Sequence, residues 1–128
     1  MALQRVMHVE DDESIRAVTE IALTDVAGFT LLSCDSGHNA LMQVEAFAPQ
    51  LILLDVMMPK MDGLQTLVAL RQLPGMEHVP VVFMTAKIQQ AEKQQYIDAG
   101  AIAVIDKPFE PMELGDTLSR LYQQSQIT

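Results

Sequence analysis

The sequence has little of several features that mark particular classes of protein. Its single cysteine, Cys34, excludes an intrachain disulfide framework and a cysteine-based zinc site. It has only 8 basic residues against 17 acidic ones, a formal charge of −9, so we expect neither nucleic acid nor an anionic membrane as the main partner. No apolar run approaches the ~20 residues of a membrane span, and the N-terminus lacks the apolar core of a signal peptide. We therefore expect a cytoplasmic protein.

The length of 128 residues corresponds to one domain, because domains cluster at roughly 100–150 residues. A chain of this size buries about two-thirds of the surface that its unfolded form exposes, so it needs no disulfide or metal to fold. The sequence contains no internal repeat, linker or low-complexity segment. We expect residues 1–128 to form a single domain with no room for a second, output domain.

Short apolar runs alternate with stretches of helical periodicity. The runs are bounded by Gly, Pro or Asp and predict five strands, Arg5–Val9, Phe29–Cys34, Leu51–Leu54, Val79–Met84 and Ala101–Ile105. The helical stripes between and after them are Ile15/Val18/Ala22/Val26, Ala40/Leu41/Val44/Phe47, Leu64/Leu67/Val68/Leu70, Ala91/Gln95/Ala99 and Leu114/Leu118/Leu121. Gly28 and Gly100 are expected to end the first and fourth helices. This alternation predicts a parallel sheet with helices on both faces.

Polar residues follow the predicted strands where a parallel sheet binds its ligands, beyond the carboxyl ends. Glu10 and Asp11 follow the first strand, Asp55 the third, Thr85 the fourth and Lys107 the fifth. Acidic residues near a helix N-terminus also favour the helix dipole, which explains Asp12 and Glu13 without any function. The same explanation fails for Asp55, which directly follows the apolar run Leu51–Leu54.

A single lysine cannot neutralise three clustered carboxylates. Lys107 could pair with Asp55 for structural reasons alone, but Glu10 and Asp11 would then remain uncompensated. Carboxylate oxygens are ligands that suit Mg²⁺, which relieves such repulsion. With the cation in place, a carboxylate nucleophile, a hydroxyl and an ammonium form a complete set for phosphoryl transfer.

The chain resembles the receiver domain of two-component response regulators. The resemblance covers nearly the whole chain and rests on Val-Glu-Asp-Asp at 9–12, Leu-Asp-Val-Met-Met-Pro-Lys-Met-Asp-Gly at 54–63, Met-Thr-Ala at 84–86 and Asp-Lys-Pro-Phe at 106–109. It implies an α/β fold, a doubly wound five-stranded parallel sheet of order 2-1-3-4-5 with five helices. It also implies a signalling phospho-acceptor rather than a metabolic enzyme, with activity only in its own phosphorylation and dephosphorylation.

The resemblance assigns a role to each residue of the site. Asp55 would accept a phosphoryl group from the phosphohistidine of a sensor histidine kinase or a phosphotransfer protein. Mg²⁺, or Mn²⁺ in its place, would be held by Asp55, by Asp11 directly, by Glu10 mainly through water, and by the backbone carbonyl of Met57. Thr85 and Lys107 would bind the phosphoryl group, and the Lys107–Pro108 peptide would be cis. The output would reach a protein target through the face of the fourth helix, fifth strand and fifth helix.

Three positions modify these expectations. Val104 stands where the family usually carries a Phe or Tyr that turns inward on activation, so we expect Thr85 and the following loop to transmit the signal instead. In this family the positions of Met57 and Lys87 flank the path of the attacking water, and the apolar Met57 cannot orient that water by hydrogen bonding. We therefore expect slow self-dephosphorylation.

Four other functions compete with this one. A phosphatase of the haloacid dehalogenase type needs a second Asp where Met57 stands. A flavodoxin-like electron carrier needs a phosphate-binding loop where Glu10 and Asp11 stand. A dinucleotide-binding unit needs a G-x-G-x-x-G motif, which the sequence lacks. A receiver-like domain that is never phosphorylated would carry the same fold, and only phosphorylation data can exclude it.

Three further residues have structural interpretations. His8 alternates with apolar neighbours and is expected to be a strand residue rather than a ligand. Cys34 is expected to be a buried, inert thiol. Tyr96 lies on the fourth predicted helix, where half-buried packing is a more common role than a partner contact.

Overall fold

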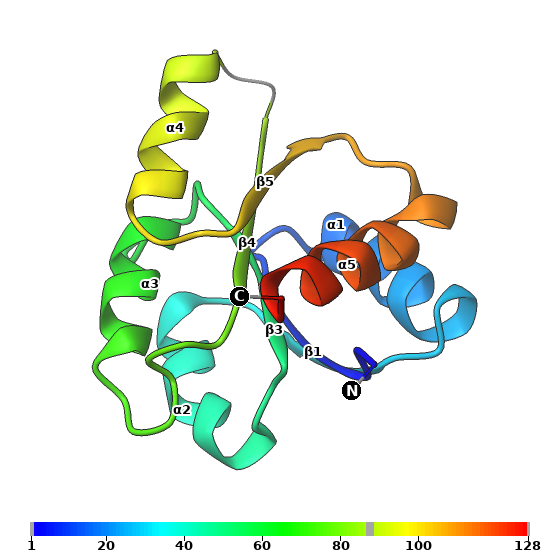
Figure 1. The fold of residues 1–128 in the computed structure, drawn as a ribbon, viewed down its shortest axis with the longest axis horizontal. Helices are drawn as coiled ribbons and strands as arrows, with labels where there is room; N and C mark the ends of the chain where they lie inside the picture. Colours follow the sequence, from blue (N-terminus) through cyan, green and yellow to red (C-terminus); the bar gives the residue numbers. More distant parts are fainter. Residues whose placement is uncertain (1, 87–88, 128) are drawn as a thin grey trace.

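The computed structural model describes residues 2–86 and 89–127, which form a five-stranded parallel sheet of order β2-β1-β3-β4-β5 (Figure 1). The strands are β1 (Arg5–Val9), β2 (Thr30–Cys34), β3 (Leu51–Asp55), β4 (Val81–Ala86) and β5 (Ala103–Lys107). The helices are α1 (Glu13–Glu20), its π-helical continuation η1 (Ile21–Val26), α2 (Gly37–Phe47), α3 (Gly63–Arg71), α4 (Gln90–Asp98) and α5 (Pro111–Ser125). The predicted fold class and strand order are confirmed.

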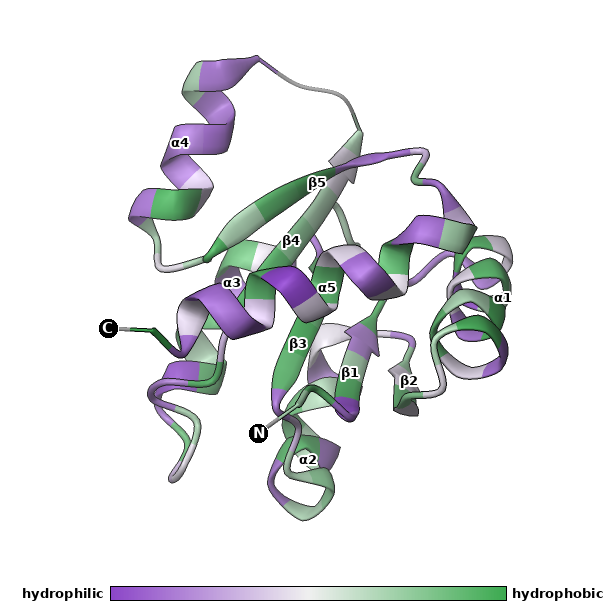
Figure 2. Cartoon of the chain, turned by 45° about the vertical axis from the view of Figure 1, so that its right-hand side comes forward, coloured by the Kyte–Doolittle hydropathy of each residue, from purple (hydrophilic) through white to green (hydrophobic). Residues whose placement is uncertain are grey.

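Helices cover both faces of the sheet (Figure 1). On one face α1, η1 and α5 pack through a cluster that includes Leu23, Leu114 and Leu118. On the other face α2 and α3 pack through a cluster that includes Val44 and Leu67. The central strand β3 is buried along its whole length and is mostly hydrophobic (Figure 2). That double burial is the reason its sequence shows no polar alternation.

Strands β4 and β5 both begin and end later than their apolar runs predict. Pro80 has no N–H to donate to a ladder, and β4 begins directly after it. At the other end, Thr85 pairs with Asp106 and Ala86 with Lys107. Backbone pairing does not depend on side-chain polarity, so the polar residues Thr85, Asp106 and Lys107 lie within the strands rather than after them.

The first helix buries only part of the predicted stripe. Ala22 is buried and Ile15 packs against the core, as predicted, whereas Val18 and Val26 are each 44% exposed and Thr19 and Leu23 are buried instead. The packing of this helix against β2 and α5 determines which of these positions face the core. In η1 each backbone hydrogen bond spans one residue more than in an α-helix, and the Ala27 N–H at its end donates to the carbonyl of Ala22.

Helix α4 contradicts its predicted stripe, because Ala91, Gln95 and Ala99 are exposed and α4 has no fully buried residue. Its inward positions are Lys93 and Tyr96. The Lys93 ammonium lies 3.0 Å from an Asp106 carboxylate oxygen, and the Tyr96 ring lies 5.3 Å from the Phe83 ring. The sequence has no apolar face here, so an ion pair and one aromatic ring hold α4 to the sheet.

The remaining helices follow their predicted patterns more closely. Ser36 caps α2 through the Asn39 N–H, and Pro111 occupies the first turn of α5. Leu114 and Leu118 of α5 are buried, as predicted, but Val68 of α3 is 63% exposed. The predicted ends at Gly28 and Gly100 are confirmed, and both glycines have positive φ. In the part of the chain that the structure describes, no helix is long and apolar enough to cross a membrane.

Candidate functional site

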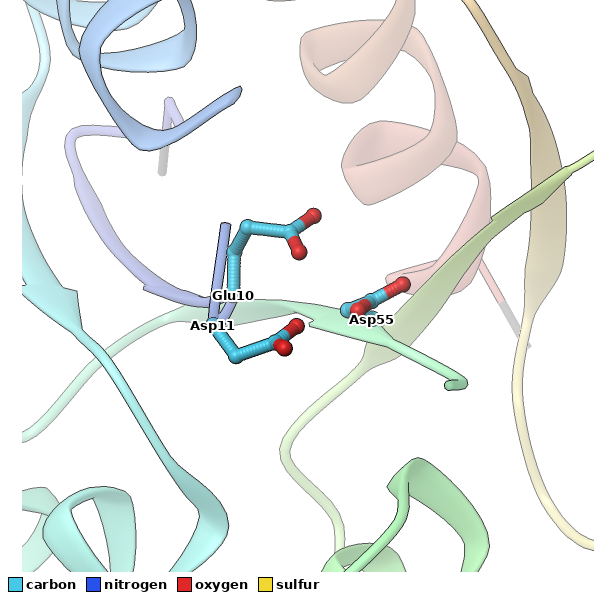
Figure 3. Close-up of side chains that lie close together, drawn as sticks. All are labelled: Glu10, Asp11 and Asp55. Atoms are coloured by element: carbon cyan, nitrogen blue, oxygen red, sulfur yellow. The ribbon is translucent and has the colours of Figure 1, made fainter. Parts of the chain in front are cut away.

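Three carboxylates meet at the carboxyl edge of the sheet (Figure 3). Val9 at the end of β1 pairs with Leu54 of β3, so Glu10, which directly follows β1, and Asp55, the last residue of β3, lie at the same edge. Carboxylate oxygens of Glu10, Asp11 and Asp55 all lie within 4.8 Å of one another. Glu10 and Asp55 are only 1% and 2% exposed, whereas Asp11 is exposed. The structure thus brings together the acidic residues that the sequence singled out.

Lys107 reaches the cluster from β5 across the intervening strand β4. Its ammonium lies 2.7 Å from Asp55 Oδ1 and 2.8 Å from Glu10 Oε1. Both contacts are charge-assisted hydrogen bonds between largely buried groups. The following Lys107–Pro108 peptide is cis, as the resemblance implies.

The negative charge of the cluster exceeds what Lys107 can neutralise. Burial, together with the nearby Asp55, raises the pKa of Glu10 to about 7 despite the opposing effect of Lys107. Burial by itself would lower the pKa of Lys107, but its hydrogen bonds to Asp55 and Glu10 outweigh burial and raise it. Lys107 therefore stays charged, and with all three carboxylates ionised the cluster has a net charge of −2, which a divalent cation would match.

The loop after β3 holds Asp55 in position through the start of α3. The Gly63 N–H donates to the carbonyl of Val56 at 2.8 Å, and Asp62 caps α3 in a reciprocal capping box with Gln65. A Cβ at Gly63 would lie 2.4 Å from the Asp55 carbonyl oxygen and 2.8 Å from the Val56 Cα. Only glycine therefore lets α3 begin this close to the backbone of the site.

The other two predicted site residues lie at the same edge. Thr85 is buried near the end of β4, one residue beyond Met84, the ladder partner of Asp55. Among the described residues, no hydrogen bond joins the Thr85 hydroxyl to Asp55. The Met57 side chain is 75% exposed, two residues after Asp55. The roles of the Thr85 hydroxyl and the Met57 carbonyl stay predictions, and Lys87 lies outside the described residues.

His8 and Cys34 have the structural roles expected of them. His8 is fully buried in β1, and within the described residues neither ring nitrogen has a hydrogen-bond partner. Burial, together with the charges of Lys107 and Arg16, lowers the pKa of His8 to about 3 and keeps the imidazole neutral. Cys34 is buried and free, and burial followed by the charge of Asp35 raises the pKa of its thiol to about 11.

Two contacts around the site were not predicted from the sequence. The Arg16 guanidinium donates hydrogen bonds to the backbone carbonyls of Glu10 and Asp11. Asp106 turns away from the cluster, opposite to its neighbour Lys107, and pairs with Lys93 of α4. An arginine at position 16 only weakly indicates a contact with the site, because a helical arginine usually faces solvent. The Lys93–Asp106 pair joins separate elements, and no sequence pattern around either residue predicts it.

The residues at this edge fit a hard divalent cation. Three carboxylates converge from two strand ends, two of them buried, and their combined charge is only partly balanced. Mg²⁺ binds through a few carboxylates and keeps several waters, which suits a cluster with one exposed member. The chemistry of the donor set therefore agrees with the predicted metal.

Residues 6–119 match the family model of the response regulator receiver domain. The chain belongs to this family, whose members act in two-component signalling and accept a phosphoryl group on an aspartate. Receiver domains generally bind Mg²⁺ through an acidic cluster of this kind, and interact with histidine kinases and downstream targets.

Similar proteins include a transcriptional regulator and a histidine kinase. The chain is 32% identical over 124 residues to the alkaline phosphatase synthesis transcriptional regulatory protein PhoP of Bacillus subtilis, covering 97% of this chain and 50% of that protein. It is 32% identical over 123 residues to the signal transduction histidine-protein kinase BarA of Escherichia coli, covering 96% of this chain and 13% of that protein. The chain thus spans half or less of the length of these relatives.

A solved structure matches along nearly its whole length. The chemotaxis protein CheY4 of Vibrio cholerae superimposes with a TM-score of 0.86 at 31% identity. The match covers 94% of this chain and 99% of that chain. The fold is therefore that of a CheY-like receiver domain.

The raised pKa of Glu10 predicts a specific pH dependence of stability in the metal-free protein. The pKa of Glu10 in the folded protein, about 7, exceeds the ordinary value of 4.5. The contribution of Glu10 to the free energy of unfolding is therefore fully present below about pH 4.5 and is lost as pH rises through about 7. We expect the free energy of unfolding of the wild type, relative to Glu10→Gln, to fall between about pH 5 and about pH 8.

Urea denaturation of both proteins in a chelating buffer measures this difference. The low pKa of His8 changes stability in the opposite direction, but His8 is present in both proteins and its effect cancels to first order. A difference that stays constant or rises with pH would contradict the buried, proton-binding state of Glu10.

Proposed function

We propose that Asp55 is the phosphoryl acceptor of this receiver domain and that the donor is a phosphohistidine on a sensor histidine kinase or phosphotransfer protein. The observation that carries the proposal is the pairing of the buried Asp55 carboxylate with the Lys107 ammonium at 2.7 Å, inside a cluster of further carboxylates. A structural aspartate needs only the ion pair. The additional acids at the same point are explained by a cation and a phosphoryl group.

In the proposed reaction a carboxylate oxygen of Asp55 attacks the phosphorus atom. An O–P bond forms, the N–P bond of the phosphohistidine breaks, and the imidazole leaves with the electron pair and takes a proton from solvent. Lys107 moves from the carboxylate to a phosphoryl oxygen, and the Thr85 hydroxyl binds another. In the later hydrolysis a water attacks the phosphorus, the bond between Asp55 and phosphorus breaks, and inorganic phosphate leaves; this step would be the slow self-dephosphorylation of the domain.

Glu10, Asp11, Asp55 and the backbone carbonyl of Met57 would hold Mg²⁺, or Mn²⁺ in its place. The bound cation supplies the positive charge that offsets the incoming phosphoryl oxygens. Asp11 is the exposed member of the cluster and suits a direct ligand, whereas Glu10 is committed to Lys107 and to the Asp12 N–H and suits contact through water.

The domain would act as a switch rather than as a metabolic enzyme. A phosphatase of the haloacid dehalogenase type would need a carboxylate at position 57, where the exposed Met57 stands. The activity of this domain would be limited to its own phosphorylation and dephosphorylation.

The free Cys34 thiol is compatible with a reducing compartment, and we place the reaction in the cytoplasm. Nucleic acid and membrane are not expected as partners, given the charge of −9.

Asp55→Asn is expected to abolish phosphorylation. Incubation with Mg²⁺ and acetyl phosphate should add one phosphoryl group to the wild type, detected by intact-protein mass spectrometry. Asp116→Asn removes an exposed carboxylate from α5 and should leave this mass gain unchanged. A mass gain that persists in Asp55→Asn would disprove the acceptor assignment, and its absence in the wild type would support the unphosphorylated receiver-like alternative.

We propose that the signal reaches a protein target through α4, β5 and α5. Asp106 and Lys107 are consecutive in β5, so the strand that contacts Asp55 also contacts α4. Val104 packs against the same apolar cluster as Phe83 and Tyr96, and it has no ring that could swing inward. The conformational change of this face would therefore be transmitted by Thr85, by the loop after it and by the contact of Asp106 with Lys93.

Phosphorylation is expected to loosen α4, because Lys107 would leave Asp55 and displace its neighbour Asp106. Amide hydrogen exchange in Gln90–Asp98 should be faster in the phosphorylated wild type than in the unphosphorylated form. Lys93→Gln should speed this exchange by up to about fivefold before phosphorylation, because a partly exposed ion pair contributes at most ~1 kcal/mol.

The control for Lys93→Gln is Asp98→Asn, which changes an exposed charge on the same helix and should leave the exchange of α4 nearly unchanged. Equal exchange of α4 in the phosphorylated and unphosphorylated wild type would refute this route of transmission.

Met57→Asn is expected to shorten the lifetime of the phosphorylated state severalfold. The exposed Met57 side chain offers no strong hydrogen bond, whereas the Asn amide can orient the attacking water. The decay of the phosphorylated mass after removal of acetyl phosphate measures the rate. Met57→Leu keeps the position apolar and should retain the slow decay. An unchanged rate in Met57→Asn would show that position 57 does not control the water.

A further inference from the structure

Arg16 binds the backbone of the loop that carries the acidic pair. From the first turns of α1, one guanidinium nitrogen, Nη1, donates to the carbonyl of Glu10 at 2.8 Å and to that of Asp11 at 3.0 Å. Hydrogen bonds from a charged donor are stronger than neutral ones, and Arg16 is partly shielded from solvent. One side chain therefore holds two successive carbonyl groups of the site.

The other contacts of this loop leave the direction of Asp11 open. The Glu10 N–H donates to the Cys34 carbonyl at 3.0 Å, and the Glu10 carboxylate accepts from the Asp12 N–H and from Lys107. Asp12 caps α1 through the Ile15 N–H. For Asp11, the structure describes no hydrogen bond to the carboxylate. Its place beside Glu10 and Asp55 therefore depends on its backbone, and the Arg16 contacts restrict that backbone.

We propose that Arg16 is a positioning residue of the metal site. By holding the carbonyls of Glu10 and Asp11, it limits the rotation of these two residues and directs the Asp11 carboxylate toward the cluster before a cation binds. This inference deepens the proposed function and rests on its assignment of the acidic cluster as the metal site. Removing a residue that orients metal ligands through hydrogen bonds typically weakens metal binding by roughly 10–100-fold.

Charge alone predicts the opposite effect. The guanidinium is a cation close to the site, so in a purely electrostatic account it repels Mg²⁺ and its removal tightens binding. Positioning by hydrogen bonds predicts that removal weakens binding. The two accounts also differ for Arg16→Lys, which keeps the charge but replaces the planar guanidinium by a compact ammonium on a shorter side chain.

Arg16→Met, Arg16→Lys and the control Arg120→Met separate these accounts. Arg120 is exposed on α5, and its replacement removes the same charge well away from the site. Calorimetric titration with MgCl₂ should give a Kd raised roughly tenfold in Arg16→Met, raised also in Arg16→Lys, and unchanged in Arg120→Met. A Kd in Arg16→Met that is unchanged or lower than that of the wild type would overturn the proposal.

Amide hydrogen exchange without metal provides a second measurement that does not depend on the proposed function. The amides of Glu10 and Asp12, which donate to the Cys34 carbonyl and to the Glu10 carboxylate, should exchange faster in Arg16→Met and Arg16→Lys than in the wild type, while amides of β3 and β4 keep their protection. Unchanged exchange at Glu10 and Asp12 would overturn the positioning role even if Mg²⁺ binds. A wild type that binds Mg²⁺ but gains no phosphoryl group on Asp55 would instead count against the proposed function alone.

Discussion

The ammonium of Lys107 joins the two buried carboxylates on which the carboxyl edge of the sheet is built. It crosses β4 to lie 2.7 Å from Asp55 and 2.8 Å from Glu10, side chains that are almost completely removed from solvent. Buried carboxylates require compensation, and one lysine provides it only in part. Burial, and after it the nearby Asp55, raises the pKa of Glu10, and the negative charge that Lys107 leaves unbalanced makes the edge attractive to a divalent cation. Structural stability and the proposed chemistry thus have the same electrostatic origin.

Strand β5 connects this site to the surface of the molecule. Successive residues of a strand point to opposite sides, so Lys107 faces the carboxylates while Asp106 faces α4. Helix α4 has no fully buried residue and depends on Lys93 and Tyr96 for its contact with the sheet. An element attached this weakly can change position at low energetic cost. The arrangement suits a domain whose chemistry at one edge must alter a surface that another protein reads.

Where the sequence pattern was strong, the fold could be predicted from it. The apolar run Leu51–Leu54 predicted a central strand, and α5 buries Leu114 and Leu118, two of the three leucines that its period indicated. The prediction was wrong for the buried face of α4 and for part of the first helix. In that helix Ala22 faces the core as predicted, whereas Val26 is exposed and Leu23 is buried where η1 contacts α5. In α4 no apolar stripe exists, so the inward residues are those that find partners on β4 and β5.

The sequence by itself determined the alternation of strands and helices, the parallel sheet, and the set of polar residues at its carboxyl edge. These depend on local periodicity and on the rule that parallel strands end at one edge. Only the tertiary structure decided which of those residues touch. The Lys107 contacts, the Arg16 bonds to the loop carbonyls and the Lys93–Asp106 pair each require a distance that the folded backbone sets. Residue type can suggest such contacts, but separation along the chain carries no information on the distance between side chains in space.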